Sequence, residues 1–284
     1  MTHEQHDTPP PNPLGLTLDA FRSAVNERGF GPGQSQRAYR AFFRGGPDER
    51  DAELETTRNP SGKLTLTRYA GTSPTRRRVI ARATIAPISK QASEEVAEGT
   101  TTKFCQRLDD MPRPPQTGRA GDAHFMGVLK DESSIAHLDI ESVIIPMRGR
   151  TGTRTSTLCV SSQVGCAMKC GFCETAQMGL IRSLSAEEIV GQWFAATHLK
   201  ETRIDNIVFM GMGEPMDNAD EVIRAISVLT DHNGPAVPMA NITVSTVGRI
   251  DGLERLGEVI RRPGWHRLGL AVSINAPNDE IRSK

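Results

Sequence analysis

Hydrophobic and polar positions change their spacing about halfway along the chain. Near the start, a helical spacing places Leu18, Phe21 and Val25 on one face. Gly29 is a natural end for that helix, and a second short helix is predicted over residues 35–44. The pattern therefore predicts a small helical module in the first part of the chain.

Alternating apolar and polar residues then predict four strands, at Lys63–Tyr69, Arg77–Ile85, Thr101–Leu108 and Asp139–Met147. Between the last two strands, residues 111–137 are rich in Pro and Gly and are expected to form a long loop or insertion. We expect a disordered tail over 1–15, an accessory region of helices and then strands over 16–95, and a β-hairpin region over 96–150.

Beyond residue 150, predicted strands and helices alternate. The strands are Thr155–Gln163, Asp205–Met210, Asn241–Thr246 and Arg267–Ile274, and the helices between them cover 186–198, 218–230 and 252–260. Ser185 and Glu188 have the spacing of a capping box at the first of these helices. Such alternation predicts an α/β fold with a parallel sheet and right-handed crossovers, although four strands are too few to close a barrel.

Composition and charge limit the classes of function. The chain of 284 residues has 34 Lys and Arg against 34 Asp and Glu, so binding to nucleic acid would depend on local patches. The first helical region is one such patch, because it has five arginines (22, 28, 37, 40 and 44) against Asp19 and Glu27, although an ordinary solvated face is the simpler interpretation. No stretch approaches the roughly 20 apolar residues of a membrane span, and the N-terminus does not resemble a secretory signal, so we expect a cytoplasmic protein.

Three of the five cysteines form a compact group, Cys166-x3-Cys170-x2-Cys173. A structural zinc site needs four ligands, and the loop offers no fourth Cys or His. Three thiolates suit a [4Fe–4S] cluster whose fourth iron stays open to a small molecule. The uneven spacing, with Phe172 before the last cysteine, is typical of radical S-adenosylmethionine (SAM) enzymes. A zinc site and a chance group of buried cysteines remain open as alternatives.

Further candidate residues follow the later strands. The sequence GMGEP (Gly211–Pro215) comes at the end of the second strand of the alternating region, where Glu214 could accept hydrogen bonds from the ammonium group of SAM. Ser245 and Ser273 lie at the ends of the third and fourth strands, and active sites of α/β barrels gather at that edge. A plain turn and solvated strand ends are the alternative interpretations.

Four stretches together resemble the radical SAM adenine methyltransferases that act on large-subunit ribosomal RNA. They are Cys159–Cys173 (CVSSQVGCAMKCGFC), GMGEP, Ile242–Gly248 (ITVSTVG) and Leu270–Asp279 (LAVSINAPND). The family branch includes dual-specificity enzymes that also modify tRNA, and the Cfr antibiotic-resistance enzymes. The resemblance implies a partial (β/α)6 radical SAM barrel of about four βα units over 151–284, preceded by the helical and β accessory region.

The resemblance also implies roles for individual residues. Cys166, Cys170 and Cys173 correspond to the cluster ligands, and the SAM contacts correspond to Gly213, Glu214, Ser245, Ser273, Ile274 and Asn275. Glu141 matches the family's proton acceptor, and Cys159 matches the cysteine that resolves a covalent enzyme–RNA adduct. On the residues alone, a merely exposed strand glutamate is as good an interpretation of Glu141, and a small buried hydrophobic residue is the simpler interpretation of Cys159.

The activity that the resemblance implies is methylation of an adenine carbon, preferably C2, in large-subunit rRNA, with tRNA as a further candidate substrate. An adenine carbon flanked by ring nitrogens offers no nucleophile, so a one-electron route through the cluster and SAM is required. We expect structured RNA and an electron donor such as flavodoxin as partners, no membrane, and a monomer.

One feature of the family has no counterpart here. The family's methyl-carrying cysteine lies near the C-terminus, whereas the only remaining thiol in this chain is Cys105. A radical SAM enzyme with another substrate, an inactive truncated relative and a zinc-bearing RNA-binding protein are therefore the alternatives.

Overall fold

The computed structural model describes residues 9–47, 53–71, 77–108, 138–149, 152–274, 278 and 280. The chain divides into two compact units, each assembled from three segments. Unit 1 comprises Met1–Ile88, Ser185–Arg203 and Arg224–Val237, and unit 2 comprises Ser89–Leu184, Ile204–Ile223 and Pro238–Lys284. The domain ranges expected from the sequence are consecutive, whereas each of these units contains three separate segments of the chain. The insertion expected over 111–137 lies outside the described residues.

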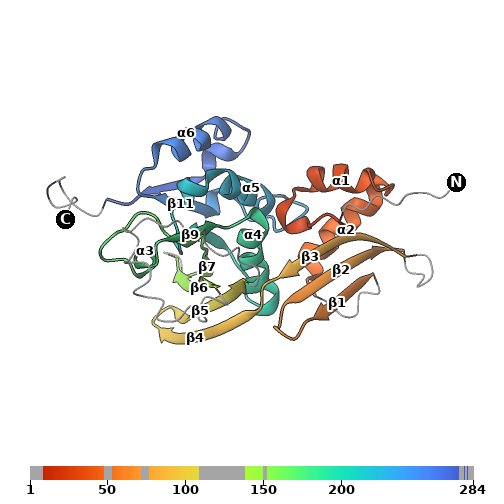
Figure 1. The fold of residues 1–284 in the computed structure, drawn as a ribbon, viewed down its shortest axis with the longest axis horizontal. Helices are drawn as coiled ribbons and strands as arrows, with labels where there is room; N and C mark the ends of the chain where they lie inside the picture. Colours follow the sequence, from red (N-terminus) through yellow and green to blue (C-terminus); the bar gives the residue numbers. More distant parts are fainter. Residues whose placement is uncertain are drawn as a thin grey trace, which may run out of the picture. The chain divides into compact units, whose positions relative to one another are not determined.

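Unit 1 combines helices with a three-stranded antiparallel sheet of order β1-β2-β3 (Figure 1). Its elements are η1 (Pro13–Gly15), α1 (Leu18–Asn26), α2 (Pro32–Gly45), β1 (Leu54–Arg58), β2 (Leu64–Ala70), β3 (Arg78–Ile85), α4 (Ala186–Phe194) and the π-helical turn η3 (Ala195–Leu199). Helix α1 buries Leu18, Phe21 and Val25, as the periodicity predicts. Helix α2 begins three residues earlier than expected because Pro32 suits the first turn of a helix.

Aromatic side chains form much of the core of unit 1. The ring centroids of Phe21 and Tyr39 are 5.5 Å apart, those of Tyr39 and Phe43 are 4.9 Å apart, and those of Phe42 and Phe194 are 5.4 Å apart. These centroid distances are in the range at which aromatic pairs add to the free energy of burial. Part of the segment expected to be a disordered tail is folded, because Pro13–Gly15 form η1 and Leu14 is fully buried. The polar composition of residues 1–15 gave no indication of this buried residue.

Unit 2 is built on a seven-stranded sheet of order β12-β11-β10-β7-β6-β5-β4. Its strands are β4 (Ile88–Val96), β5 (Gly99–Leu108), β6 (Leu138–Arg148), β7 (Arg154–Cys159), β10 (Asn206–Phe209), β11 (Ile242–Thr246) and β12 (Gly269–Val272), and a separate pair is formed by β8 (Gln163–Gly165) and β9 (Leu180–Ser183). Its helices are α3 (Glu174–Gln177), η4 (Pro215–Asn218), η5 (Met239–Asn241), α6 (Ile250–Val259) and η6 (Trp265–Arg267), while α5 (Ala219–Leu229) begins in unit 2 and continues in unit 1.

The strands β7, β10, β11 and β12 pair in parallel and in chain order, so the α/β fold with four barrel-type strands is confirmed. Strands β5 and β6 extend this sheet as an antiparallel hairpin, with Leu108 opposite Leu138. None of the described helices is long and apolar enough to cross a membrane.

The strand predicted over 155–163 is wrong in its second half, because the chain forms β7, a short break and then β8. At the break, the Ser162 backbone N–H donates to the Met212 carbonyl (2.8 Å), and the Met212 N–H donates to the Ser161 hydroxyl (2.9 Å). These bonds to the segment after β10 replace the regular strand ladder, and no local pattern in the sequence encodes them.

Candidate functional site

The loops at the carboxyl ends of the parallel strands are joined by hydrogen bonds in unit 2. The Ser161 hydroxyl, just after β7, donates to the Glu141 carbonyl on β6 (2.7 Å) and accepts from Met212 after β10. Further on, the Asn218 side-chain amide donates to the carbonyls of Ser162 (2.9 Å) and Leu184 (2.8 Å). Ligands of open α/β sheets bind at this edge, so the network supports the surface on which a site is expected.

Two glycines of GMGEP are required by packing. Gly213 has φ +98°, and a Cβ there would lie 2.5 Å from the Gln163 Cβ. A Cβ on Gly211 would lie 2.8 Å from the Ser161 hydroxyl and from the Val160 carbonyl. The segment after β10 therefore lies directly against the segment after β7, at a separation that side chains would prevent.

Glu214 is a buried carboxylate, with 3% of its surface exposed. One of its oxygens accepts from the Met216 N–H (2.9 Å), at the start of η4, and the other accepts from the Val247 N–H (2.9 Å), just after β11. Its own N–H donates to the Gln163 side chain (2.9 Å). Glu214 thus ties three strand ends together, and each carboxylate oxygen keeps a lone pair for a further donor.

The two serines singled out in the sequence are brought together. The hydroxyl oxygens of Ser245 and Ser273 are 3.2 Å apart, and the Ser273 N–H donates to the Thr246 carbonyl (2.8 Å). Ile274 is 73% exposed, and Asn275 lies outside the described residues. Ser245 is two residues from Val247, the residue that donates to Glu214, so these groups share one end of β11.

The three clustered cysteines lie in the loop between β8 and α3. At its start, Gly165 has φ +74°, and the Cys166 N–H donates to the Gly179 carbonyl (3.0 Å). At its end, Cys173 is the N-cap of α3, and its N–H donates to the Cys170 carbonyl (3.0 Å). The antiparallel pair β8–β9 therefore fixes the base of the cysteine loop.

The charge of Glu214 affects the pKa of Cys166 in this loop. Burial raises the pKa of the Cys166 thiol, the Met168 N–H lowers it, and the charges of Cys170, Cys173 and Glu214 raise it again. Negative charge on these four groups is therefore mutually unfavourable unless a cationic centre is present.

The donor set of the loop is three cysteines, Cys166, Cys170 and Cys173. A four-iron cluster can take three thiolates, each on a different iron, and leave its fourth iron open. A structural zinc site commonly takes four ligands. The chemistry of the donor set therefore fits the four-iron cluster.

Glu141 and Cys159 lie on the same sheet, on neighbouring strands. Glu141 on β6 is opposite Cys105 on β5, and it forms an ion pair with Lys103, also on β5. Cys159 on β7 is opposite Val143, two residues along from Glu141 on the same face of β6. The ion pair with Lys103 explains how a carboxylate shares a strand face with apolar residues.

The thiol of Cys159 is protonated at neutral pH. Burial raises its pKa from 9.0 to about 11, a backbone N–H at Met210 partly offsets this, and the nearby charge of Glu141 raises the pKa further. The structure thus places Cys159 and Glu141 within electrostatic reach of each other.

We expect Cys159 to react slowly with thiol reagents at pH 8, because only the thiolate reacts. A pKa raised by about two units lowers the thiolate fraction about 100-fold, and the reaction rate should climb tenfold per pH unit until the pH nears 11. Alkylation by iodoacetamide, followed on the Cys159 peptide by mass spectrometry with N-acetylcysteine as the reference, measures this. Equal rates for Cys159 and N-acetylcysteine at pH 8 would contradict the burial argument.

Several residues of the site were not singled out in the sequence. Gln163, Asn218 and Ser161 connect the strand ends, and Lys103 pairs with Glu141. Ser161 and Gln163 lie inside the cysteine-rich motif, which is the one signal that could have drawn attention to them. Asn218 and Lys103 have no such signal, because their partners are distant in sequence.

Comparison with known proteins shows what this sequence and fold are similar to. The sequence model of the Radical SAM superfamily matches residues 160–284. The crystal structure of a radical SAM methyltransferase from Sphaerobacter thermophilus has the same fold, with a TM-score of 0.63 at 24% identity over 96% of this chain and 66% of that chain. Residues 160–284 are therefore similar in sequence to the Radical SAM superfamily.

Proteins of similar sequence are named as RNA methyltransferases. The chain is 49% identical over 152 residues to a probable dual-specificity RNA methyltransferase RlmN 1 of Protochlamydia amoebophila, covering 53% of this chain and 40% of the relative. It is 48% identical over 207 residues to a ribosomal RNA large subunit methyltransferase N of Nitrosopumilus maritimus, covering 64% of this chain and 57% of the relative. The chain is thus similar to RNA methyltransferases of the RlmN type, and it spans about half the length of these relatives.

Proposed function

We propose that this chain is a radical SAM methyltransferase that methylates carbon 2 of an adenine in large-subunit ribosomal RNA, with tRNA as a second substrate. The observation that carries the proposal is the juxtaposition of three thiols in one loop with Glu214 at the carboxyl edge of the parallel sheet. The names of the relatives, which are RNA methyltransferases, support RNA as the substrate class.

Cys166, Cys170 and Cys173 would hold three irons of a [4Fe–4S] cluster, and the fourth iron would be open to SAM. When reduced, such a cluster supplies the electron that cleaves SAM into methionine and a 5′-deoxyadenosyl radical. The free lone pairs of Glu214 would accept from the amino group of SAM, and Gly213 would let the cofactor approach the backbone closely. The hydroxyls of Ser245 and Ser273, with Ile274 and Asn275 beyond them, complete the proposed SAM contacts.

Glu141 and Cys159 are proposed to act on the RNA adduct. Glu141, which forms an ion pair with Lys103, is the proposed proton acceptor. The Cys159 thiol lies within electrostatic reach of that carboxylate. After the thiol loses its proton, its sulfur would form a disulfide with the enzyme sulfur that links to the RNA. The carbon–sulfur bond of the link would break in that step, and the released methyl carbon, which keeps the electron pair, would take a proton. A cytoplasmic location, a monomeric state and an electron donor such as flavodoxin belong to the same proposal.

Anaerobic reconstitution with iron and sulfide tests the proposal. We expect about four irons per chain and formation of 5′-deoxyadenosine when dithionite and SAM are added. Methylated adenine in an rRNA transcript, separated by mass spectrometry after nuclease digestion, tests the substrate. Zinc bound without iron, or no 5′-deoxyadenosine, would overturn the proposal, whereas SAM cleavage without methylation of RNA would indicate another substrate.

A further inference from the structure

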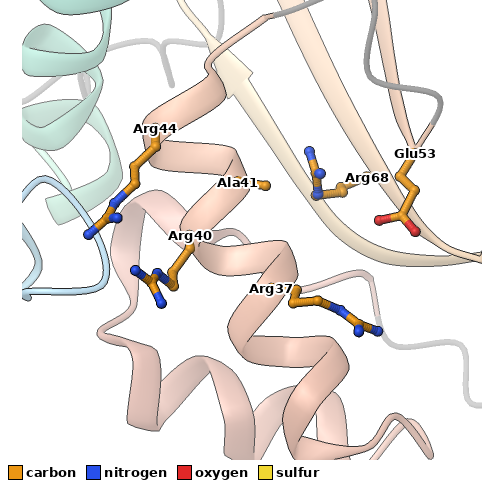
Figure 2. A pocket seen from close by; sticks show the side chains of 6 residues that line it. All are labelled: Arg37, Arg40, Ala41, Arg44, Glu53 and Arg68. Atoms are coloured by element: carbon orange, nitrogen blue, oxygen red, sulfur yellow. The ribbon is translucent and has the colours of Figure 1, made fainter.

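The arginines of helix α2 in unit 1 do not converge on one site. The cleft beside this helix is lined by Arg37, Arg40, Ala41, Arg44, Glu53 and Arg68 (Figure 2). Arg40 and Arg44 point away from Arg68 and Glu53, and the Arg44 guanidinium donates to the His232 carbonyl (3.3 Å). The basic patch expected from the sequence is thus arranged like an ordinary solvated face.

A cation of unit 2, Lys103, lies on the same face of the sheet as the candidate residues Glu141 and Cys159. Residues directly opposite one another on paired antiparallel strands point to the same side of a sheet. Val143 of β6 is opposite Lys103 of β5 on one side and Cys159 of β7 on the other. Lys103, Val143 and Cys159 therefore form one row across three strands.

Glu141 occupies the next row, and Lys103 reaches it diagonally. Glu141 is opposite Cys105 and two residues from Val143, so its side chain lies on the same face as that row. Diagonal neighbours on paired strands are within reach of long side chains, and the Lys103 ammonium forms an ion pair with the Glu141 carboxylate. The ammonium therefore draws the carboxylate toward the row that contains Cys159.

The neighbouring carboxylate of Asp139 has cations of its own. Asp139 lies two residues before Glu141 on the same face, pairs with Arg107 (3.3 Å) and Lys90 (3.7 Å), and accepts from the Ser89 hydroxyl (2.9 Å). Like charges repel, so Asp139 disfavours a Glu141 side chain that turns toward it. Attraction by Lys103 and repulsion by Asp139 thus direct the Glu141 carboxylate the same way.

The exposure of the ion pair indicates that it serves placement more than stability. The Lys103 side chain is 51% exposed and that of Glu141 is 36% exposed, and ion pairs so exposed add little to the free energy of folding. The charge of Glu141 is one cause of the raised pKa of Cys159, in agreement with a carboxylate held near that thiol.

We infer that Lys103 is a positioning residue, which holds the Glu141 carboxylate beside Cys159, where Glu141 acts as the proton acceptor. The inference rests on the proposed function, which gives Glu141 that role. It adds strand β5 to the elements that build the candidate site.

The test measures how strongly the charge of Glu141 acts on Cys159 with and without Lys103. Glu141→Gln removes the charge and keeps the shape, and Lys103→Met removes the ammonium and keeps a long side chain. Alkylation of Cys159 by iodoacetamide at pH 8 is followed on its peptide for the full chain, the two single variants and the double variant. Lys90→Met is the matched control, because Lys90 is a cation of the adjacent strand β4 that pairs with Asp139.

With Lys103 present, Glu141→Gln should speed the alkylation of Cys159 about threefold, because removing a nearby negative charge raises the thiolate fraction. With Lys103→Met, the same change should alter the rate by less than about 1.5-fold, which a double-mutant cycle reports as coupling. The Lys90→Met and Lys103→Arg backgrounds should keep the larger effect. Thermal unfolding midpoints check the fold, and Lys103→Gln gives the same comparison if the methionine variant unfolds.

Methylation of the rRNA transcript provides the second readout. Lys103→Met should lower kcat about tenfold and leave KM for RNA within about twofold, because a displaced general base slows the reaction more than it weakens binding. Lys103→Arg should recover most of the kcat, and Lys90→Met should match the parent.

The inference is overturned if Glu141→Gln has the same effect with and without Lys103, or no effect in the parent chain. Loss of that effect in Lys90→Met or in Lys103→Arg, or a parent-like kcat in Lys103→Met, also overturns it. The failure of the proposed function would be recognised separately, as absence of 5′-deoxyadenosine from the parent chain, since the alkylation rates need neither SAM nor RNA.

Discussion

Replacing Cys173 by alanine is expected to abolish reductive SAM cleavage while leaving the fold intact. Cys173 is half-buried at the N-cap of α3, and its side chain makes no capping hydrogen bond, so losing the sulfur should cost about 1 kcal/mol of folding free energy or less. Mutation of residues that only support a metal ligand lowers metal affinity or activity 10- to 100-fold. Loss of one of the three ligands itself should have a larger effect, and we expect 5′-deoxyadenosine formation to fall on the order of 1,000-fold. Iron content per chain and chromatography of the nucleoside measure the two effects.

Cys105 provides the matched control. It is another half-buried cysteine of unit 2, on β5, and lies outside the cysteine loop. Cys105→Ala should keep the parent's iron content and SAM cleavage. Equal iron content in the Cys173 variant and the parent would exclude the assignment of this cysteine as a ligand.

Gly165→Ala is expected to break the base of the cysteine loop. Gly165 has φ +74°, and an added Cβ would lie 1.8 Å from the Gly179 carbonyl oxygen, the same oxygen that accepts from the Cys166 N–H. Because the position of a Cβ is fixed by its own backbone and the Gly179 carbonyl is itself backbone, no side-chain rotation relieves the overlap. The strained φ and the overlap together should cost on the order of 3 kcal/mol or more, by moving β8 away from β9.

Gly171→Ala makes the same chemical change in the same loop without the overlap. Nothing lies within 4 Å of a Cβ built there, and Gly171 does not have a positive φ. Denaturant unfolding of the metal-free proteins should therefore show a large loss of stability for the Gly165 variant and little change for the Gly171 variant. Two equal midpoints would mean that the β8–β9 pair does not anchor the loop.

The fold could be predicted where hydrophobic periodicity is strong. The buried face of α1 and the four parallel strands agree with the sequence pattern. Strand β4 was missed because most of its residues are exposed and polar, which gives no alternation of apolar positions. The break after β7 was missed because hydrogen bonds to Met212, some fifty residues away, produce it.

The sequence could propose residues for the candidate site but not their contacts. Motif spacing singled out the three cysteines, Glu214 and the two serines at strand ends. It did not show that both oxygens of Glu214 accept backbone N–H groups from different segments. Nor did it show the pairing of Lys103 with Glu141, because that contact depends on the register of β5 against β6, two strands that are not adjacent in the sequence.

The hydrogen bonds among Ser161, Gln163, Glu214 and Asn218 have a consequence for how a nucleoside cofactor would bind. These side chains fasten the strand ends to one another through partners that belong to the protein itself. The entropy of ordering this rim is thus lost when the chain folds, before any cofactor arrives. A ligand entering such a preorganised rim retains more of its gross interaction energy as affinity.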